Sequence, residues 1–226
     1  MLRRLKILLL CLVEDAIRGL SGPLGVRLRR SYYSRRFQQC GARLTVDAGV
    51  HIVAPDRISV GDDVWIDRGV ILIAGPPDRM ANVERRATPK RPIAAGDIVL
   101  GKNAHVGIGT IIQGHGGVVI GDYFTSSPQV KIYSFSNDYR KSEAGTIRTD
   151  AMRHSYILTP VFIDNNVWVG MNATIIGHSI GADTFVRPMS VVSADIGPNS
   201  VVCGNPATRL GARFRRCDIQ EAVSGD

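Results

Sequence analysis

The sequence predicts an all-β protein, a left-handed parallel β-helix with an N-terminal α-helical segment and two long loop insertions. Three observations support this prediction: a six-residue repeat through most of the chain, a basic and apolar stretch before it, and two stretches that interrupt it. The chain of 226 residues contains 24 glycines, while aromatic residues make up only 6%. This composition favours tight backbone turns and aliphatic layers over a helical bundle.

Residues 1–39 are predicted to form a basic helical segment. They hold nine Arg or Lys residues against Glu14 and Asp15, a net charge of +7, which leaves +1 for the rest of the chain. The apolar run ILLLCLV is far shorter than the ~20 residues that a membrane-spanning helix needs. The charged residues after it make a poor signal-peptide cleavage site. The segment favours an interfacial helix ending near Gly19 and Pro23, with arginines available to anionic lipid headgroups. The alternative is a helix that caps the core or packs on a neighbouring subunit.

The charge and the cysteines also bear on partners and compartment. Because the positive charge is concentrated in residues 1–39, a general nucleic-acid-binding surface is not expected. The cysteines show no CxxC spacing, which favours free thiols in a reducing cytoplasm; they are Cys11, Cys40, Cys203 and Cys217. We therefore expect a cytoplasmic protein, peripheral at the inner face of the cytoplasmic membrane if the helical segment binds lipid.

From about residue 60 the sequence repeats every six residues, with an aliphatic residue at most starts, often Gly or Asp next, and a small or branched residue in fifth place. Fifteen starts follow this pattern: Val60, Ile66, Leu72, Leu100, Val106, Ile112, Ile120, Ser126, Ile132, Ile163, Val169, Ile175, Ile180, Val186 and Val192. A looser trio precedes them at Cys40, Val46 and Ile52.

The starts fall in threes, which predicts 18-residue coils with three short strands each. Such coils stack into a triangular prism whose aliphatic residues form one continuous core, with Gly, Asp or Asn at the corners. We expect this β-helix domain to span residues 40–208 and a basic C-terminal tail to span residues 209–226.

Two stretches interrupt the repeat. Residues 75–97 contain Pro76, Pro77, Pro89 and Pro92 and cannot continue a strand, and residues 138–160 are polar. Long loops that leave a rigid repeat are usually functional or assembly elements.

The stretches PVFIDNNVWVGMNATII and SIGADTFVRPMSVVSADIGPNSVVCGNPATRL resemble the C-terminal coils of hexapeptide-repeat O-acetyltransferases. These include the maltose and galactoside acetyltransferases and the polysaccharide O-acyltransferases. The most specific pieces are 167–170, 190–192 and 204–207, and the likeness covers roughly residues 40–215. The basic leader looks like the N-terminal segments of exopolysaccharide and lipopolysaccharide acyltransferases.

The resemblance implies an O-acetyltransferase that acts on a sugar or a surface-polysaccharide precursor, with acetyl-CoA as co-substrate. It implies a homotrimer in which acyl-CoA lies in a groove between neighbouring prisms. A histidine then takes the proton from the acceptor hydroxyl, which attacks the thioester directly, while a backbone N–H holds the developing oxyanion.

The family's histidine is replaced in this chain. The matching segment reads IGDYFTSSPQVKIYSFSND, which places Asn137 or Asp138 at its position. Asparagine cannot act as a base, and an aspartate is a weak base at neutral pH unless burial raises its pKa.

Counting along the coils offers replacements for this histidine. His115 lies three residues after Ile112, and His178 lies three after Ile175, so both are expected on the prism edge of Asn137. We predict His115 as the general base, hydrogen-bonded by Asp138, with His178 in reserve. His154 on the second loop is a further candidate, while His51 and His105 fall on other corners. The alternative for each histidine is a solvated surface residue.

The donor side is also predicted from the resemblance. Gly170, Met171 and Ser190 match positions where the family binds the pantetheine arm through backbone amides, although Pro188 has no N–H to give. Asn205 and the basic tail are candidates for the nucleotide phosphates; the tail residues are Arg209, Arg213, Arg215 and Arg216. The alternative for the tail is a solvated charge run.

Two other functions remain open. A γ-type carbonic anhydrase has the same kind of prism, but it needs three histidines that converge on one metal, and the closely spaced coil histidines are missing. No metal is therefore expected. A catalytically inactive β-helix that serves as an assembly or scaffold protein is the stronger alternative, because the family's histidine is replaced.

Overall fold

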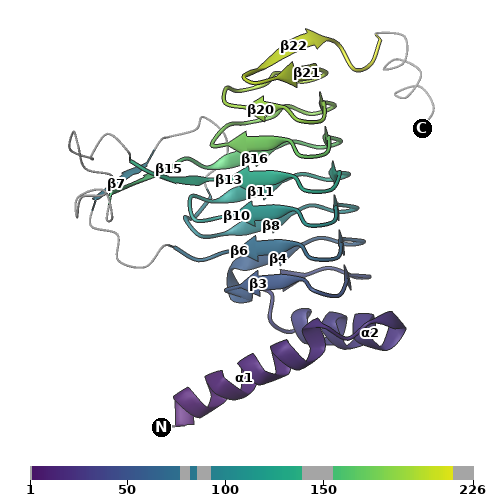
Figure 1. Ribbon diagram of the computed structural model, residues 1–226, viewed down its shortest axis with the longest axis vertical. Coiled ribbons are helices and arrows are strands. Elements are labelled where there is room, and N and C mark those ends of the chain that lie inside the picture. Colours follow the sequence, from purple (N-terminus) through teal and green to yellow (C-terminus); the bar gives the residue numbers. More distant parts are fainter. Residues whose placement is uncertain (1, 77–81, 86–92, 139–154, 216–226) are drawn as a thin grey trace.

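The computed structural model describes residues 2–76, 82–85, 93–138 and 155–215. Two helices lie at one end of a tall prism of short strands, and a hairpin closes the other end (Figure 1). The helices are α1 (Leu2–Arg18) and α2 (Gly22–Tyr33). None of the helices in these ranges is long and apolar enough to cross a membrane.

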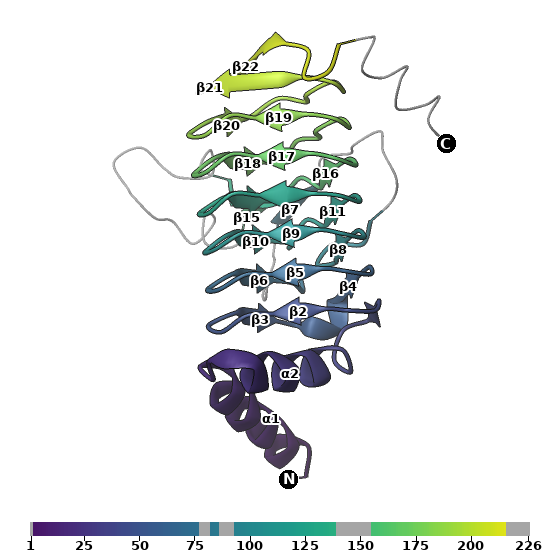
Figure 2. The ribbon, with the colours of Figure 1, turned by 90° about the vertical axis from the view of Figure 1, so that its right-hand side faces the viewer.

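Three sheets form the faces of the prism, with all strands parallel except β22 at the end of one sheet, and we name them A, B and C in the order in which the chain visits them (Figure 2). Sheet A contains β1 (Gln39–Cys40), β4 (Ile58–Val60), β8 (Ile98–Leu100), β11 (Val118–Ile120) and β16 (Val161–Ile163). Sheet B contains β2 (Thr45–Val46), β5 (Trp65–Ile66), β9 (His105–Val106), β12 (Thr125–Ser126), β17 (Trp168–Val169), β19 (Phe185–Val186), β21 (Val201–Gly204) and β22 (Ala207–Gly211). Sheet C contains β3 (His51–Val53), β6 (Ile71–Ile73), β10 (Ile111–Gln113), β13 (Lys131–Tyr133), β18 (Thr174–Ile176) and β20 (Val191–Val192).

The repeat starts point inward and stack in columns, as predicted. On sheet C, Ile112 pairs with Leu72 and with Ile132, and Ile132 pairs with Ile175. These side chains are buried and belong to one hydrophobic cluster that runs through the coils. The looser trio before residue 60 supplies the first coil, β1 to β3. The predicted left-handed parallel β-helix is therefore confirmed.

The predicted coil length of 18 residues is wrong. Val46 pairs with Ile66 twenty positions later, whereas Val186 follows its partner Val169 by 17 positions. The spacing from sheet A to B and from B to C stays at six residues, so the variation lies at the corner from sheet C back to sheet A. In the first coil this C–A corner contains a short 3-10 helix, Pro55–Arg57. The number of residues at this corner differs from coil to coil, so the corner sets the coil length.

Both insertions leave the prism at the C–A corner. The first connects β6 to β8 and the second connects β13 to β16. Their described strands are β7 (Asn82–Arg85) and β15 (Ser155–Leu158), which pair in parallel, and β15 also pairs antiparallel with β14 (Phe135–Asn137). The two insertions thus meet in a three-stranded sheet beside the prism.

The other sharp corner, from sheet A to sheet B, places one residue per coil in the left-handed backbone region, with φ between 48° and 59°. Asparagine and aspartate tolerate this region better than other non-glycine residues. They occupy five of the seven positions, which are Arg43, Asp63, Asn103, Tyr123, Asn166, Asp183 and Asn199. The predicted corner chemistry is confirmed here, with arginine and tyrosine as additions.

A buried arginine joins the helices to the first coil. Arg29 of α2 is 1% exposed, and its guanidinium donates to the carbonyl oxygens of Ile17 and Leu20 near the end of α1, at 2.8 and 2.6 Å. Its Nε donates to the Val46 carbonyl at 2.9 Å. Burial lowers the pKa of this group below its ordinary value, although an arginine keeps its charge. Arg29 is therefore not available to lipid headgroups, which corrects one of our expectations for the basic segment.

The division of the chain at residues 39 and 208 remains a proposal. The first strand begins at Gln39, and β22 runs across the second boundary. Cys11, Cys40 and Cys203 are free thiols, as expected, while Cys217 lies outside the described residues.

Candidate active site

The C–A corner carries one column of side chains, each three residues after an inward residue of sheet C. We call this column the histidine edge; from the third coil to the sixth it consists of His115, Phe135, His178 and Asp195. Counting from Ile112 and Ile175 had placed the two histidines on one edge, and the strand register bears out that counting.

His115 is held in one orientation by the backbone. Its Nδ1 lies 2.6 Å from the carbonyl oxygen of Gly75, at the point where the first insertion leaves the prism. A carbonyl oxygen only accepts hydrogen bonds, so Nδ1 carries the proton and Nε2 of the neutral ring is left as an acceptor. The ring also packs edge-on against Phe135, with 5.1 Å between centroids. This tautomer and fixed orientation suit a general base.

The residues at the family's histidine position lie beside the edge rather than on it. Asn137 ends β14 and pairs with Tyr156 across the small sheet, and its side chain is exposed. Asp138 follows it and is 5% exposed. We expected Asp138 to orient His115, but the described contact that does so comes from Gly75. His154 lies outside the described residues.

His178 faces a groove on the same edge. The groove has a volume of about 280 Å³, and its lining includes Phe135, Ser136, His178 and Ser193. The Nδ1 of His178 lies 3.3 Å from an Asp195 carboxylate oxygen, which also accepts the Ser179 amide at 2.8 Å. A histidine with a carboxylate on one nitrogen is a second arrangement that suits proton transfer.

Asp195 and Phe135 were missed by the sequence reasoning, although the signal was present. Asp195 lies three residues after Val192, as His178 lies three after Ile175. The same counting that selected the histidines would have selected both residues had it been continued along the whole column.

The predicted donor residues lie on a different corner, where sheet B turns into sheet C. Gly170 and Met171 lie between β17 and β18, and Ser190 lies between β19 and β20. Met171 is 48% exposed, but the Gly170 amide donates to the Val186 carbonyl at 2.7 Å. The Ser190 hydroxyl is buried and accepts the Gly204 amide at 3.2 Å. One prism therefore does not bring these residues to the histidine edge.

The end of the described chain packs back on the prism. Asn205 is exposed in the turn between β21 and β22. Arg213 donates to the Asn166 carbonyl at 2.5 Å and its guanidinium lies over the Phe214 ring, while Arg209 donates to the Ser200 hydroxyl at 3.1 Å. Arg216 lies outside the described residues.

Within the described ranges, no three histidine, cysteine or acidic side chains come together as a metal-binding group. His51 is exposed on sheet C, and His105 lies on sheet B with Asp67.

Sequence comparison finds similar acyltransferases. The dTDP-4-amino-4,6-dideoxy-D-glucose acyltransferase of Escherichia coli is 26% identical over 195 residues, which cover 83% of this chain and 88% of that protein. The galactoside O-acetyltransferase of Escherichia coli strain K12 is 29% identical over 149 residues, or 66% of this chain and 60% of that protein. No family model matches the chain.

Solved structures share the fold. AntD, an N-acyltransferase from Bacillus cereus crystallised with dTDP and coenzyme A, superimposes with a TM-score of 0.67 at 20% identity, over 87% of this chain and 95% of that one. A maltose O-acetyltransferase from Clostridium difficile 630 gives a TM-score of 0.58 at 18% identity, over 92% and 86%. The chain is thus similar in sequence to sugar acyltransferases and shares the prism fold of hexapeptide-repeat acyltransferases.

Proposed function

We propose that this protein transfers an acetyl group from acetyl-CoA to a hydroxyl group of a sugar or a surface-polysaccharide precursor. The observation that carries the proposal is the fixed tautomer of His115, whose Nε2 is left as an acceptor by the hydrogen bond to Gly75. The relatives support the choice of reactants, because they include a galactoside O-acetyltransferase.

In the proposed reaction, His115 Nε2 removes the proton of the sugar hydroxyl as the oxygen attacks the thioester carbonyl. A backbone N–H stabilises the oxyanion of the tetrahedral intermediate. The intermediate then expels the sulfur of coenzyme A, which takes the proton from the imidazolium, so that His115 returns to its starting form. Asp138, which is buried three residues after Phe135 of the histidine edge, is proposed to stabilise the charged ring.

The donor site is proposed to come from the other corner of a neighbouring subunit. Gly170, Met171 and Ser190 would line the pantetheine arm, and Asn205 would lie near the nucleotide. Since Arg209 and Arg213 already donate hydrogen bonds to protein atoms at the A–B corner, we propose that they stabilise that corner rather than bind the nucleotide phosphates.

A second candidate is transfer to an amino group of a sugar. Asn137 stands where the resemblance expects a histidine, and a relative acts on an amino sugar, as its name states. A neutral amine is a stronger nucleophile than a hydroxyl and depends less on a general base.

The experiment measures release of the coenzyme A thiol with matched acceptors, glucose against glucosamine and galactose against galactosamine, followed by treatment of the product with hydroxylamine. The proposal expects thiol release with the hydroxyl sugars and an acyl group that hydroxylamine removes, because esters react and amides do not. Release only with amino sugars and a resistant product would favour the second candidate. No release above the acceptor-free rate with any sugar would favour the scaffold alternative.

The separation of the two corners predicts a trimer. A closed ring of three subunits lets the histidine edge of one prism face the B–C corner of the next. Light scattering should give three times the chain mass of 24.5 kDa. A monomer at micromolar concentration would leave the donor residues and the histidines on separate edges and count against the site.

Residues 1–39 are proposed to bring the protein to the inner face of the cytoplasmic membrane. Leu24, Leu28 and Arg27 of α2 are exposed, and each basic residue near anionic lipid contributes ~1 kcal/mol. Co-sedimentation with vesicles rich in phosphatidylserine should weaken with added salt and in the double variant Leu24→Gln, Arg27→Gln. Equal sedimentation of parent and variant, or none by either, would leave α2 with a packing role only.

A further inference from the structure

The outer face of sheet B carries a column of aromatic side chains. In register order the outward residues are Thr45, Trp65, His105, Thr125, Trp168, Phe185 and Val201. Trp65 and Trp168 are each 46% exposed. The Trp65 and His105 rings stack with 4.6 Å between centroids, and Trp168 lies 5.1 Å from Phe185. Each position in this column is called a rung below.

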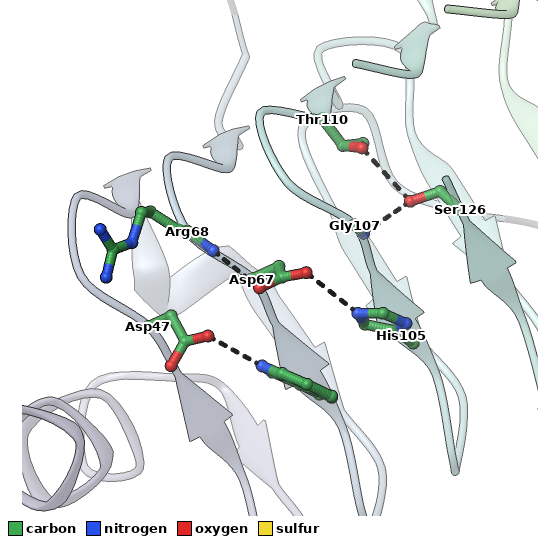
Figure 3. A network of polar contacts seen from close by, with 8 residues as sticks. Asp47, Asp67, Arg68, His105, Gly107, Thr110 and Ser126 are labelled. Carbon is green, nitrogen blue, oxygen red and sulfur yellow. Dashed lines mark hydrogen bonds and ion pairs between the residues drawn. The ribbon is translucent and has the colours of Figure 1, made fainter. Parts of the chain in front are cut away.

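The ring nitrogens of this column are bound to the coil before. Trp65 Nε1 donates to Asp47 at 3.1 Å, and His105 Nε2 lies 3.2 Å from Asp67, as Figure 3 shows for Asp67 and His105. Trp168 Nε1 donates to the Ser127 hydroxyl at 3.2 Å. In each case the polar partner lies two residues after the ring's register partner. Because these hydrogen bonds already hold the rings, the protein loses little additional side-chain freedom when a ligand stacks on them.

The rung at Thr125 lacks both members of this arrangement. Thr125 has no ring, and Gly107 occupies the position of the polar partner, two residues after His105. A Cβ on Gly107 would lie 2.2 Å from the Ser126 carbonyl oxygen, so a larger residue does not fit. Inside the prism, the Ser126 hydroxyl accepts the Gly107 amide at 2.8 Å and lies 3.2 Å from the Thr110 hydroxyl (Figure 3). The Gly107 amide and the Thr110 and Ser126 hydroxyls are thus paired inside the prism, while Gly107 and Thr125 place neither a ring nor a long polar side chain on its outer face.

A cavity lies at the same rung. It has a volume of about 200 Å³ and is lined by Tyr123, Thr125, Asn166, Val167, Trp168 and Arg213. The exposed Trp168 indole is the aromatic ring that a ligand in this cavity meets, and the Tyr123 and Thr125 hydroxyls lie in the same lining. One apolar ring face beside hydroxyl groups suits a single sugar ring, which has an apolar C–H face and polar hydroxyls.

We propose that the Thr125 rung is a binding site for a pyranose ring. The C–H face of the sugar lies on the Trp168 indole, and its hydroxyls bind the Tyr123 and Thr125 hydroxyl groups. Its role as a site for the acceptor glycan rests on the proposed function, whereas the binding itself does not. The site uses no residue of the histidine edge.

The test measures sugar binding without acyl-CoA, by saturation-transfer NMR with the methyl glycosides of glucose, galactose and mannose. The full chain should bind at least one of them. Thr125→Trp places an indole in the space that the sugar is proposed to occupy. The variant should therefore bind the sugar at least about tenfold more weakly. Thr45→Trp adds the same indole at the equivalent outward position of the first coil and should leave the binding unchanged. Trp168→Ala should weaken binding as Thr125→Trp does.

Several outcomes would overturn the site. They are no binding of any of the three glycosides by the parent chain, equal binding by the parent and Thr125→Trp, and equal loss in Thr45→Trp. If the parent chain binds no sugar and Thr125→Trp changes the oligomeric mass, this face is instead a contact between copies of the chain. Because the assay contains no acyl donor, failure of acyl transfer leaves its result unaffected, and the two proposals fail separately.

Discussion

His115→Ala should lower the rate of acyl transfer to a sugar hydroxyl by ~10²–10⁴-fold, the usual loss when a general base is removed. The reason is the hydrogen bond from Nδ1 to Gly75, which leaves Nε2 as the acceptor for the hydroxyl proton. Steady-state turnover of CoA release measures the loss. The oligomeric mass and the thermal unfolding midpoint should change little, because the ring is only half-buried beside Phe135.

His178→Ala is the competing variant, and His51→Ala is the control. His178 lines the groove and has Asp195 on its ring, so a full loss of activity in His178→Ala with normal activity in His115→Ala would move the base two positions along the edge. His51 is exposed on the strand of sheet C in the first coil, and its removal should be nearly silent. Asp138→Asn should lower turnover if this residue stabilises the charged ring, and unchanged turnover would remove it from the mechanism.

Arg29→Met should lower the free energy of unfolding by about 3 kcal/mol. The substitution keeps an unbranched side chain but removes the donors for the Val46, Ile17 and Leu20 carbonyls. Leaving a buried acceptor unsatisfied costs roughly 1–3 kcal/mol, and part of this cost is relieved where water reaches the group. Denaturant unfolding measures the change. Because a solenoid frays from its ends, hydrogen exchange should rise first in α1, α2 and the first coil.

Arg30→Met is the matched control for this prediction. Arg30 follows Arg29 on the same helix but is exposed, so its replacement should change the unfolding free energy by less than about 0.5 kcal/mol. Equal stability of the two variants would mean that the buried guanidinium contributes no more than a surface one.

The repeat made the fold predictable because each inward residue must pack on those of the coils before and after it. Ile112 and Ile175 could be placed in one column by counting, and the structure pairs both with Ile132. The coil length could not be derived in this way. It depends on the C–A corner, where the number of residues varies from coil to coil and where both insertions leave.

The candidate site was predictable in position but not in its contacts. Counting placed His115 and His178 on one edge, yet the partner of His115 is a backbone carbonyl 40 residues earlier, brought near only by stacking across an insertion. The burial of Arg29 was equally hidden, since a cluster of arginines beside an apolar run looks the same whether one of them binds lipid or caps a helix.

The central claim is that acyl-CoA binds between two subunits, with its sulfur at the histidine edge of one and its pantetheine arm along the B–C corner of the other. A crystal structure of the protein with coenzyme A bound tests this most directly. The account predicts the sulfur ~3–4 Å from the position that a reacting hydroxyl takes beside His115 Nε2, with Gly170 and Met171 of the neighbouring subunit along the arm. Coenzyme A held by a single chain, or a sulfur two or more coils away from both His115 and His178, would contradict it.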